Sequence, residues 1–126
     1  MQKLILVAGL ASLFLTGRAH AETSGEVGGW CQQYDSVSPT PGSGFIAPSD
    51  PHSLFCWGAF TSVQELISEV DSGSRRPLLS VCAPPQSTRT QLIHVFRRYI
   101  VEHPEIEHWN FGTGVVVALR AAFPCK

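Results

Sequence analysis

The chain lacks the sequence motifs of common catalytic sites. It contains neither G-x-S-x-G nor H-E-x-x-H, which mark a serine nucleophile and a zinc protease. Its acidic residues are spread over the outer faces of the expected helices, whereas general acid–base catalysis needs carboxyl groups directed into one site. We therefore expect no catalytic residues and predict that the protein is not an enzyme.

Metal-binding patterns are also absent. No C-x-x-C pair occurs, and the histidines beyond residue 21 are dispersed. His103 and His108 are separated by a proline, so they do not share a helix face, and His52 and His94 stand apart from them. Because a zinc site needs three or four convergent ligands, we expect neither a metal nor another cofactor.

Clusters of basic charge are missing as well. Lys3 and Arg18 account for two of the nine basic residues, so residues 22–126 carry seven against ten acidic residues, a net charge of about −3. Nucleic acids and anionic membrane surfaces both attract clustered Lys and Arg. The charge therefore gives no electrostatic reason to expect either partner, and we predict neither nucleic-acid nor membrane binding. Partners are expected to be recognised by shape and apolar surface.

The chain has a single long apolar run, at residues 4–16. At about 13 residues it is shorter than the roughly 20 that a membrane-spanning helix needs, which disfavours a retained anchor. Lys3 precedes the run, and Ala19 and Ala21 follow it in the order of a cleaved export signal. We predict a signal peptide at residues 1–21, cleaved after Ala21, and one exported domain at residues 22–126 without membrane association.

The four cysteines all lie in the predicted exported part. An even number of cysteines in a short exported chain predicts structural disulfides. Three pairings are open to four cysteines, and the spacing does not choose among them. The residues concerned are Cys31, Cys56, Cys82 and Cys125.

The first expected helix, residues 26–35, is weak because Gly28 and Gly29 each cost about 1 kcal/mol relative to Ala. Four of its residues nevertheless recur on one face: Val27, Trp30, Cys31 and Tyr34. Residues 36–49 follow, with three prolines and two glycines, and are predicted to be a loop. Phe45 in this loop either packs on the core or contacts a partner.

The second expected helix has the clearest boundaries. Asp50 suits the N-cap, Pro51 the first turn, and Gly73 a position beyond the end. Trp57 lies beside the apolar stripe and is a candidate for an exposed anchor in a protein interface. Apolar residues recur at three- and four-residue steps and predict the buried face: Leu54, Phe55, Ala59, Phe60, Val63, Leu66, Ile67 and Val70.

The third expected helix begins after Thr88, which with Gln91 forms a capping-box pattern, and ends at residues 103–104. Arg97 and Arg98 lie on its polar face, where they either attract an acidic partner or are simply solvated. Its apolar face consists of Leu92, Val95, Phe96, Tyr99 and Ile100.

The last segment, residues 107–123, is ambiguous. Residues 115–117 are three valines, which favour a strand, whereas residues 118–122 favour a helix. If helical, the segment is apolar on nearly all sides. Such a helix lies in the centre of a core or in an oligomer interface.

Three sequence motifs together resemble a known family. They are Cys-Ala-Pro at residues 82–84, Glu-His-Pro-Glu at 102–105 and Ala-Leu-Arg-Ala-Ala-Phe-Pro-Cys at 118–125. The chain resembles the Rap/Tai family of periplasmic immunity proteins, which protect bacteria from type VI secretion amidase effectors. The Cys-Trp-Gly at residues 56–58 matches more loosely, because Ala59 stands where the family usually has an aromatic residue.

The resemblance implies an all-α fold, a small four-helix domain stapled by disulfides Cys31–Cys56 and Cys82–Cys125, with a helical last segment. It also implies a periplasmic location, a tendency to form homodimers, and binding to a cognate peptidoglycan amidase effector that the protein occludes. Trp57, Phe45, Arg97 and Arg98 are the residues predicted to contact that partner.

The alternative function is that of a periplasmic acid-stress chaperone, since similar small disulfide-linked helical folds serve acid survival. This alternative predicts that a dimer dissociates and exposes apolar surface at low pH.

Overall fold

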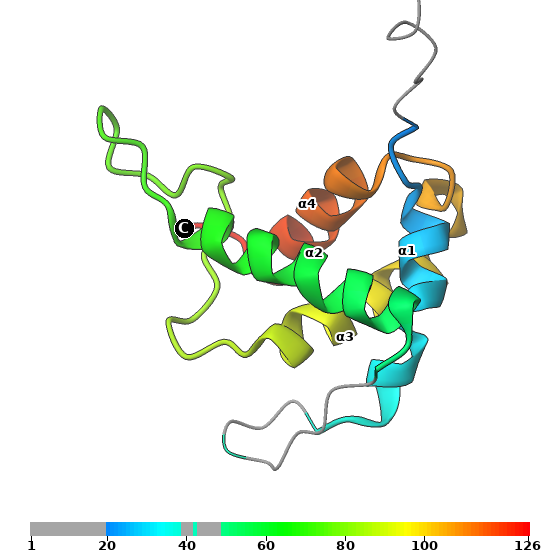
Figure 1. The fold of residues 1–126 in the computed structure, drawn as a ribbon. Coiled ribbons are helices and arrows are strands. Elements are labelled where there is room, and N and C mark those ends of the chain that lie inside the picture. Colours follow the sequence, from blue (N-terminus) through cyan, green and yellow to red (C-terminus); the bar gives the residue numbers. More distant parts are fainter. Residues whose placement is uncertain (1–19, 39–41, 43–48) are drawn as a thin grey trace, which may run out of the picture.

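The computed structural model describes residues 20–38, 42 and 49–126 (Figure 1). Apart from isolated β-bridges, the regular structure of these residues is helical, which confirms the predicted all-α class. None of the helices described is long and apolar enough to cross a membrane. The elements are α1 (Ser24–Trp30), η1 (Gln32–Ser36), α2 (Pro51–Ser68), α3 (Arg89–Glu102), η2 (Pro104–Ile106) and α4 (Phe111–Ala122), where η marks a short 3-10 helix.

The first helix begins earlier than the sequence predicts. Thr23 forms a reciprocal capping box with Glu26: the Glu26 backbone N–H donates to Thr23 Oγ1 at 3.2 Å, and the Thr23 backbone N–H donates to Glu26 Oε2 at 2.9 Å. α1 then ends at Trp30, and the chain tightens into η1. The prediction of one helix over residues 26–35 was therefore wrong in its boundaries and in its continuity.

The start of α1 pairs with the connection between α3 and α4. Backbone N–H groups of Ser24 and Gly25 donate to the carbonyls of Trp109 and Glu107, each at 2.8 Å. Phe111 N–H donates in return to Glu22 O at 2.9 Å. These bonds satisfy donors that helix starts leave without an intrahelical partner, and they fix α1 against the end of the α3–α4 pair.

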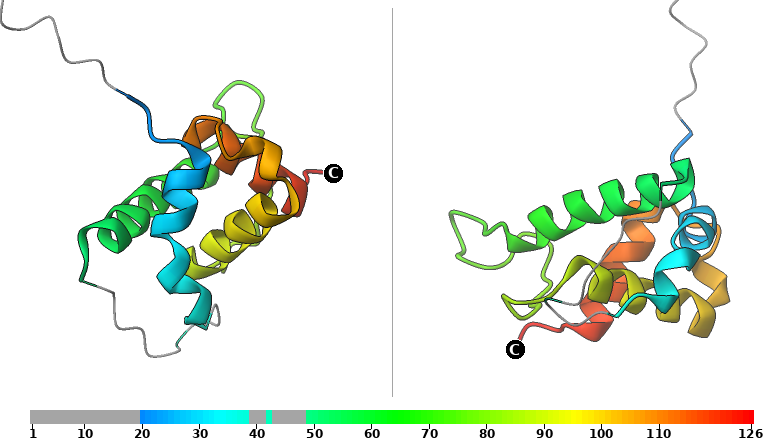
Figure 2. Two further views of the ribbon diagram at one scale, coloured as in Figure 1. Left: turned by 90° about the vertical axis from the view of Figure 1, so that its right-hand side faces the viewer. Right: turned by 60° about the horizontal axis from the view of Figure 1, so that its bottom comes forward.

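The core lies where α1 packs against the other three helices, an arrangement visible in both views of Figure 2. Phe60 of α2, Phe96 of α3 and Phe111 of α4 meet with ring centroids 5.4 to 5.7 Å apart. Burying an aromatic ring of this size contributes about 1.5–3 kcal/mol. Phe111 is partly buried, whereas Phe60 and Phe96 are fully buried. Other fully buried apolar side chains are Val27, Tyr34, Leu92, Ile93, Ala118 and Leu119.

The outer side of α2 differs from the prediction. Phe60 and Val63 are buried, but Leu54 and Leu66 remain 50% and 45% exposed. Phe55 and Val70 are exposed to a similar extent. The helix packs against α1, against α3 and, through Phe60, against Phe111 of α4, so its apolar stripe is wider than the surface that these neighbours cover. The expectation that all these residues face the core was wrong.

The two disulfides have the pairing that the family resemblance implies. Cys31 at the end of α1 is bonded to Cys56 in α2, with Cα atoms 5.4 Å apart, and both residues are fully buried. Cys82 is bonded to Cys125 with Cα atoms 5.0 Å apart, and both are exposed. In the chain-entropy model, the loop closed by Cys31–Cys56 stabilises the fold by about 3.5 kcal/mol, and the longer loop closed by Cys82–Cys125 by about 4 kcal/mol.

Candidate partner-binding site

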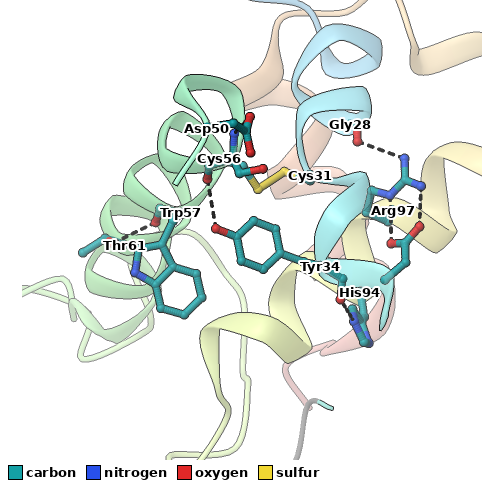
Figure 3. Close-up of a disulfide and its surroundings, with 11 residues drawn as sticks. Gly28, Cys31, Tyr34, Asp50, Cys56, Trp57, Thr61, His94 and Arg97 are labelled. Atoms are coloured by element: carbon teal, nitrogen blue, oxygen red, sulfur yellow. Dashed lines mark hydrogen bonds and ion pairs between the residues drawn. A yellow bond between two sulfur atoms is a disulfide. The ribbon is translucent and has the colours of Figure 1, made fainter. Parts of the chain in front are cut away.

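Tyr34 in η1 is the centre of the region around the buried disulfide (Figure 3). Its side chain is fully buried, and its hydroxyl donates a hydrogen bond to Ser53 O of α2 at 3.0 Å. Burial raises the pKa of Tyr34, and the negative charge of Asp50 raises it further. Tyr34 is therefore a neutral donor that joins η1 to α2 beside the Cys31–Cys56 bond.

His94 of α3 also binds η1. Its Nε2 lies 2.7 Å from Tyr34 O (Figure 3). Since a carbonyl oxygen only accepts, this nitrogen carries the proton. His94 thus binds the backbone of η1, and within the described residues no group of three His, Cys, Asp or Glu side chains is arranged to hold a metal ion.

Arg97 also has a structural position. Its guanidinium forms an ion pair with Asp35 of η1 and donates through Nη1 to Gly28 O of α1 at 2.9 Å (Figure 3). The second bond satisfies a carbonyl near the C-terminal end of α1, where positive charge is also favoured by the helix dipole. Arg97 therefore ties α3 to both α1 and η1.

Arg98, the next residue, is different. Its side chain is exposed, and no ion pair to it is formed within the described residues. The two arginines are adjacent in the sequence but differ in role. Arg97 connects helices, and Arg98 is available at the surface.

Trp57 is only partly exposed. Its ring stacks on Tyr34 with centroids 5.6 Å apart, and the guanidinium carbon of Arg89 lies 4.3 Å from the ring centroid. Both contacts hold the indole in place. That Trp57 contacts a partner stays a prediction. Phe45 lies outside the described residues, and its predicted role stays a prediction too.

An aromatic cluster where the end of α1 meets the start of α2 was not predicted from the sequence. Trp30 stacks on His52 with ring centroids 4.8 Å apart and meets Phe55 edge-on at 5.0 Å. His52 and Phe55 are exposed. A signal was present in the sequence: residues 51–64 contain no Asp, Glu, Lys or Arg. Depletion of charge is a property of interface cores as well as of protein cores, and periodicity alone does not separate them.

Taken together, the described residues form a helical scaffold with exposed apolar side chains on the uncharged part of α2, residues 51–64, and an exposed cation on α3. Ion pairs and hydrogen bonds fix the side chains around the buried disulfide. These features define a small all-α protein with two disulfides.

Comparison with known families agrees with this class. The family model of Rap1a immunity proteins matches residues 29–125, from the end of α1 to the last cysteine. The chain belongs to the Rap1a immunity protein family, which confirms the resemblance seen in its motifs. It is accordingly an immunity protein directed against a secreted effector. No curated protein and no solved structure matches the chain.

Proposed function

We propose that the protein is exported to the periplasm, where it binds a peptidoglycan amidase effector and blocks its active-site cleft. The observation that carries this proposal is the family match over residues 29–125, which includes all four cysteines. An apolar run and an Ala-His-Ala cleavage pattern at residues 1–21 support export to the compartment where peptidoglycan is cut.

The physical requirements of such an inhibitor are modest. It must present a preformed surface, because ordering side chains and loops during binding lowers affinity. Both disulfides, the Tyr34–Ser53 bond and the Arg97 contacts fix the scaffold in advance. A few exposed anchors can then supply most of the binding energy.

A protection experiment tests the proposed function and the location together. Cells that produce the neighbouring gene's effector in the periplasm should survive when they also produce the full chain. A variant lacking residues 2–21 should fail to protect, and the mature protein should begin at Glu22. Lysis in the presence of the full, exported chain would refute the inhibitor function.

We further propose that the apolar face of α2 mediates a homodimer. Leu54 and Phe55 are 50% and 44% exposed, and no charged residue lies within residues 51–64. Two-fold dimers are the commonest oligomers, and their interfaces are more apolar than other surfaces. Light scattering should show a dimer that becomes monomeric in Leu54→Lys, while Ser72→Lys, at an exposed position beyond the end of α2, should have a smaller effect.

A further inference from the structure

A hollow of about 600 Å³ lies between the second half of α2 and the segment that leads from α2 into α3. Its α2 side includes Gln64, Glu65 and Ile67, and its other side is formed by residues between Pro77 and Arg89. Sites for small molecules typically have volumes of about 300–1,000 Å³. The hollow therefore has room for a ligand the size of a short peptide.

The two sides of the hollow are joined to one another. Gln64 Nε2 donates to Ser87 O at 3.2 Å, and Leu78 N–H donates to Glu69 O at 2.9 Å. The disulfide of Cys82 ties the second side to the C-terminal end of the chain. Because these bonds exist before a ligand arrives, little order has to be created when one binds.

Arg89 brings a positive charge to the lining of the hollow. Its guanidinium carbon lies 4.3 Å from the centroid of the Trp57 ring, which holds the group in place. Its Nε is buried without a hydrogen-bond partner, and no carboxylate of the described residues forms an ion pair with it. Ser87 Oγ, which also belongs to the lining, is likewise buried without a partner. Buried polar groups are seldom left unsatisfied, and a carboxylate would supply acceptors for both.

Glu65 adds a negative charge to the same hollow. Its side chain is exposed, and it forms no ion pair with Arg89 or with any other residue that the structure describes. A cation and an anion that line one hollow without pairing to each other complement a ligand that carries both charges. Much of the remaining lining is apolar and suits an uncharged middle part of the ligand: Ile67, Val70, Val81, Ala83, Pro84 and Pro85.

We infer that this hollow is a binding site for a short peptide with small apolar side chains and both ends free. The terminal carboxylate binds Arg89 and Ser87 Oγ, and the terminal ammonium group binds Glu65. The end of a folded protein chain offers only one of these two charges, so the site favours a free peptide. This ligand site goes beyond the proposed function and does not depend on an effector.

The test is calorimetric titration of the mature chain with tri-alanine, N-acetylated tri-alanine and tri-alanine amide. Tri-alanine should bind with a Kd of about 1 mM, and each blocked peptide should bind about tenfold more weakly, because it lacks one charged end. Amide chemical shifts in a nuclear magnetic resonance titration should change at residues 61–70 and 77–89, which contain the hollow.

Two substitutions assign the ends of the peptide. Arg89→Gln should remove the preference for a free carboxylate and keep that for a free amine, whereas Glu65→Gln should do the reverse. Arg89→Lys keeps the charge and should retain part of the carboxylate preference, which separates loss of the ion pair from loss of folding. The matched controls are Arg98→Gln and Glu102→Gln, which make the same changes outside the lining and should keep both preferences.

Three outcomes would overturn the inference. The first is the absence of saturable binding up to about 10 mM tri-alanine. The second is equal affinity for free and blocked peptides, or preferences that persist in both Arg89→Gln and Glu65→Gln. The third is a set of chemical-shift changes confined to residues outside 61–70 and 77–89.

Discussion

Two glycines in α4 have opposite surroundings. A Cβ atom added to Gly114 would collide with Ser24 Oγ and lie 3.0 Å from Ser24 Cβ, whereas one added to Gly112 meets nothing within 4 Å. We expect Gly114→Ala to lower the free energy of unfolding by about 1–3 kcal/mol, because α1 must move away from α4.

The matched control is Gly112→Ala in the same helix. It should raise the free energy of unfolding by about 0.5–1 kcal/mol through lower backbone entropy of the unfolded chain. Urea denaturation measures both values. Equal effects at the two positions would contradict the close contact between α1 and α4.

Arg97 and Arg98 are a second pair of nearby residues with different surroundings. Arg97→Ala removes an ion pair to Asp35 and one of the two hydrogen bonds to Gly28 O, the other being donated by Cys31 N–H, so it should cost about 1–2 kcal/mol of stability. Arg98→Ala should stay within about 0.5 kcal/mol, as exposed substitutions usually do. Thermal unfolding of both variants distinguishes a structural arginine from a surface one. A larger loss at Arg98 would reverse the assignment.

Gly28 shows why some residues could not be interpreted from sequence. Glycine has a low helix propensity and so disfavours a helix here. A Cβ atom at this position, however, would lie 2.8 Å from Ile100 Cδ1. The glycine allows α1 to approach α3 closely. The sequence predicts the local cost correctly, but the benefit depends on a contact with a residue that is distant along the chain.

At the scale of elements, the capping box fixes where α1 begins. Thr23→Ala removes one half of it and should cost about 1 kcal/mol at neutral pH. Ser62→Ala, at an exposed position inside α2, serves as the control and should leave stability nearly unchanged or slightly higher. Urea denaturation at pH 7 measures the difference.

The same cap has a defined pH dependence. Hydrogen bonds from the backbone and side chain of Thr23 lower the pKa of Glu26, so the native state favours the carboxylate. This contribution is fully present above the usual carboxyl pKa of 4.5 and is lost as pH falls through the lower native value. The cost of Thr23→Ala should therefore be smaller at pH 3 than at pH 7. A larger cost at pH 3 would contradict the box.

The helices themselves illustrate what could be predicted. Asp50 and Thr88 cap α2 and α3 as predicted, because capping depends on neighbouring residues only. The burial of Leu54 and Phe55 was predicted wrongly. Periodicity identifies which residues share a face, whereas the width of the covered part depends on the neighbouring helices.

At the scale of the whole molecule, the two disulfides should differ in reactivity. Cys82–Cys125 is exposed and Cys31–Cys56 is fully buried, so a thiol reagent reaches only the first in the folded protein. Under mild dithiothreitol, alkylation and mass spectrometry should find Cys82 and Cys125 modified first. Simultaneous modification of all four cysteines would mean that the core opens before either bond is attacked.

The pairing of these cysteines was predictable from motifs such as Phe-Pro-Cys at residues 123–125, because they carry the family resemblance. The division of roles between Arg97 and Arg98 was not, since it depends on where η1 places Asp35. The motifs therefore identify the family, and the arrangement of helices determines which side chains remain available to a partner.

The most direct test of the immunity function is inhibition by purified components. The effector encoded next to the chain's gene is incubated with peptidoglycan while the mature chain, residues 22–126, is added in increasing amounts. We expect amidase activity to fall in proportion to added protein and to cease near equimolar amounts. Full amidase activity in the presence of excess protein would contradict the proposed function.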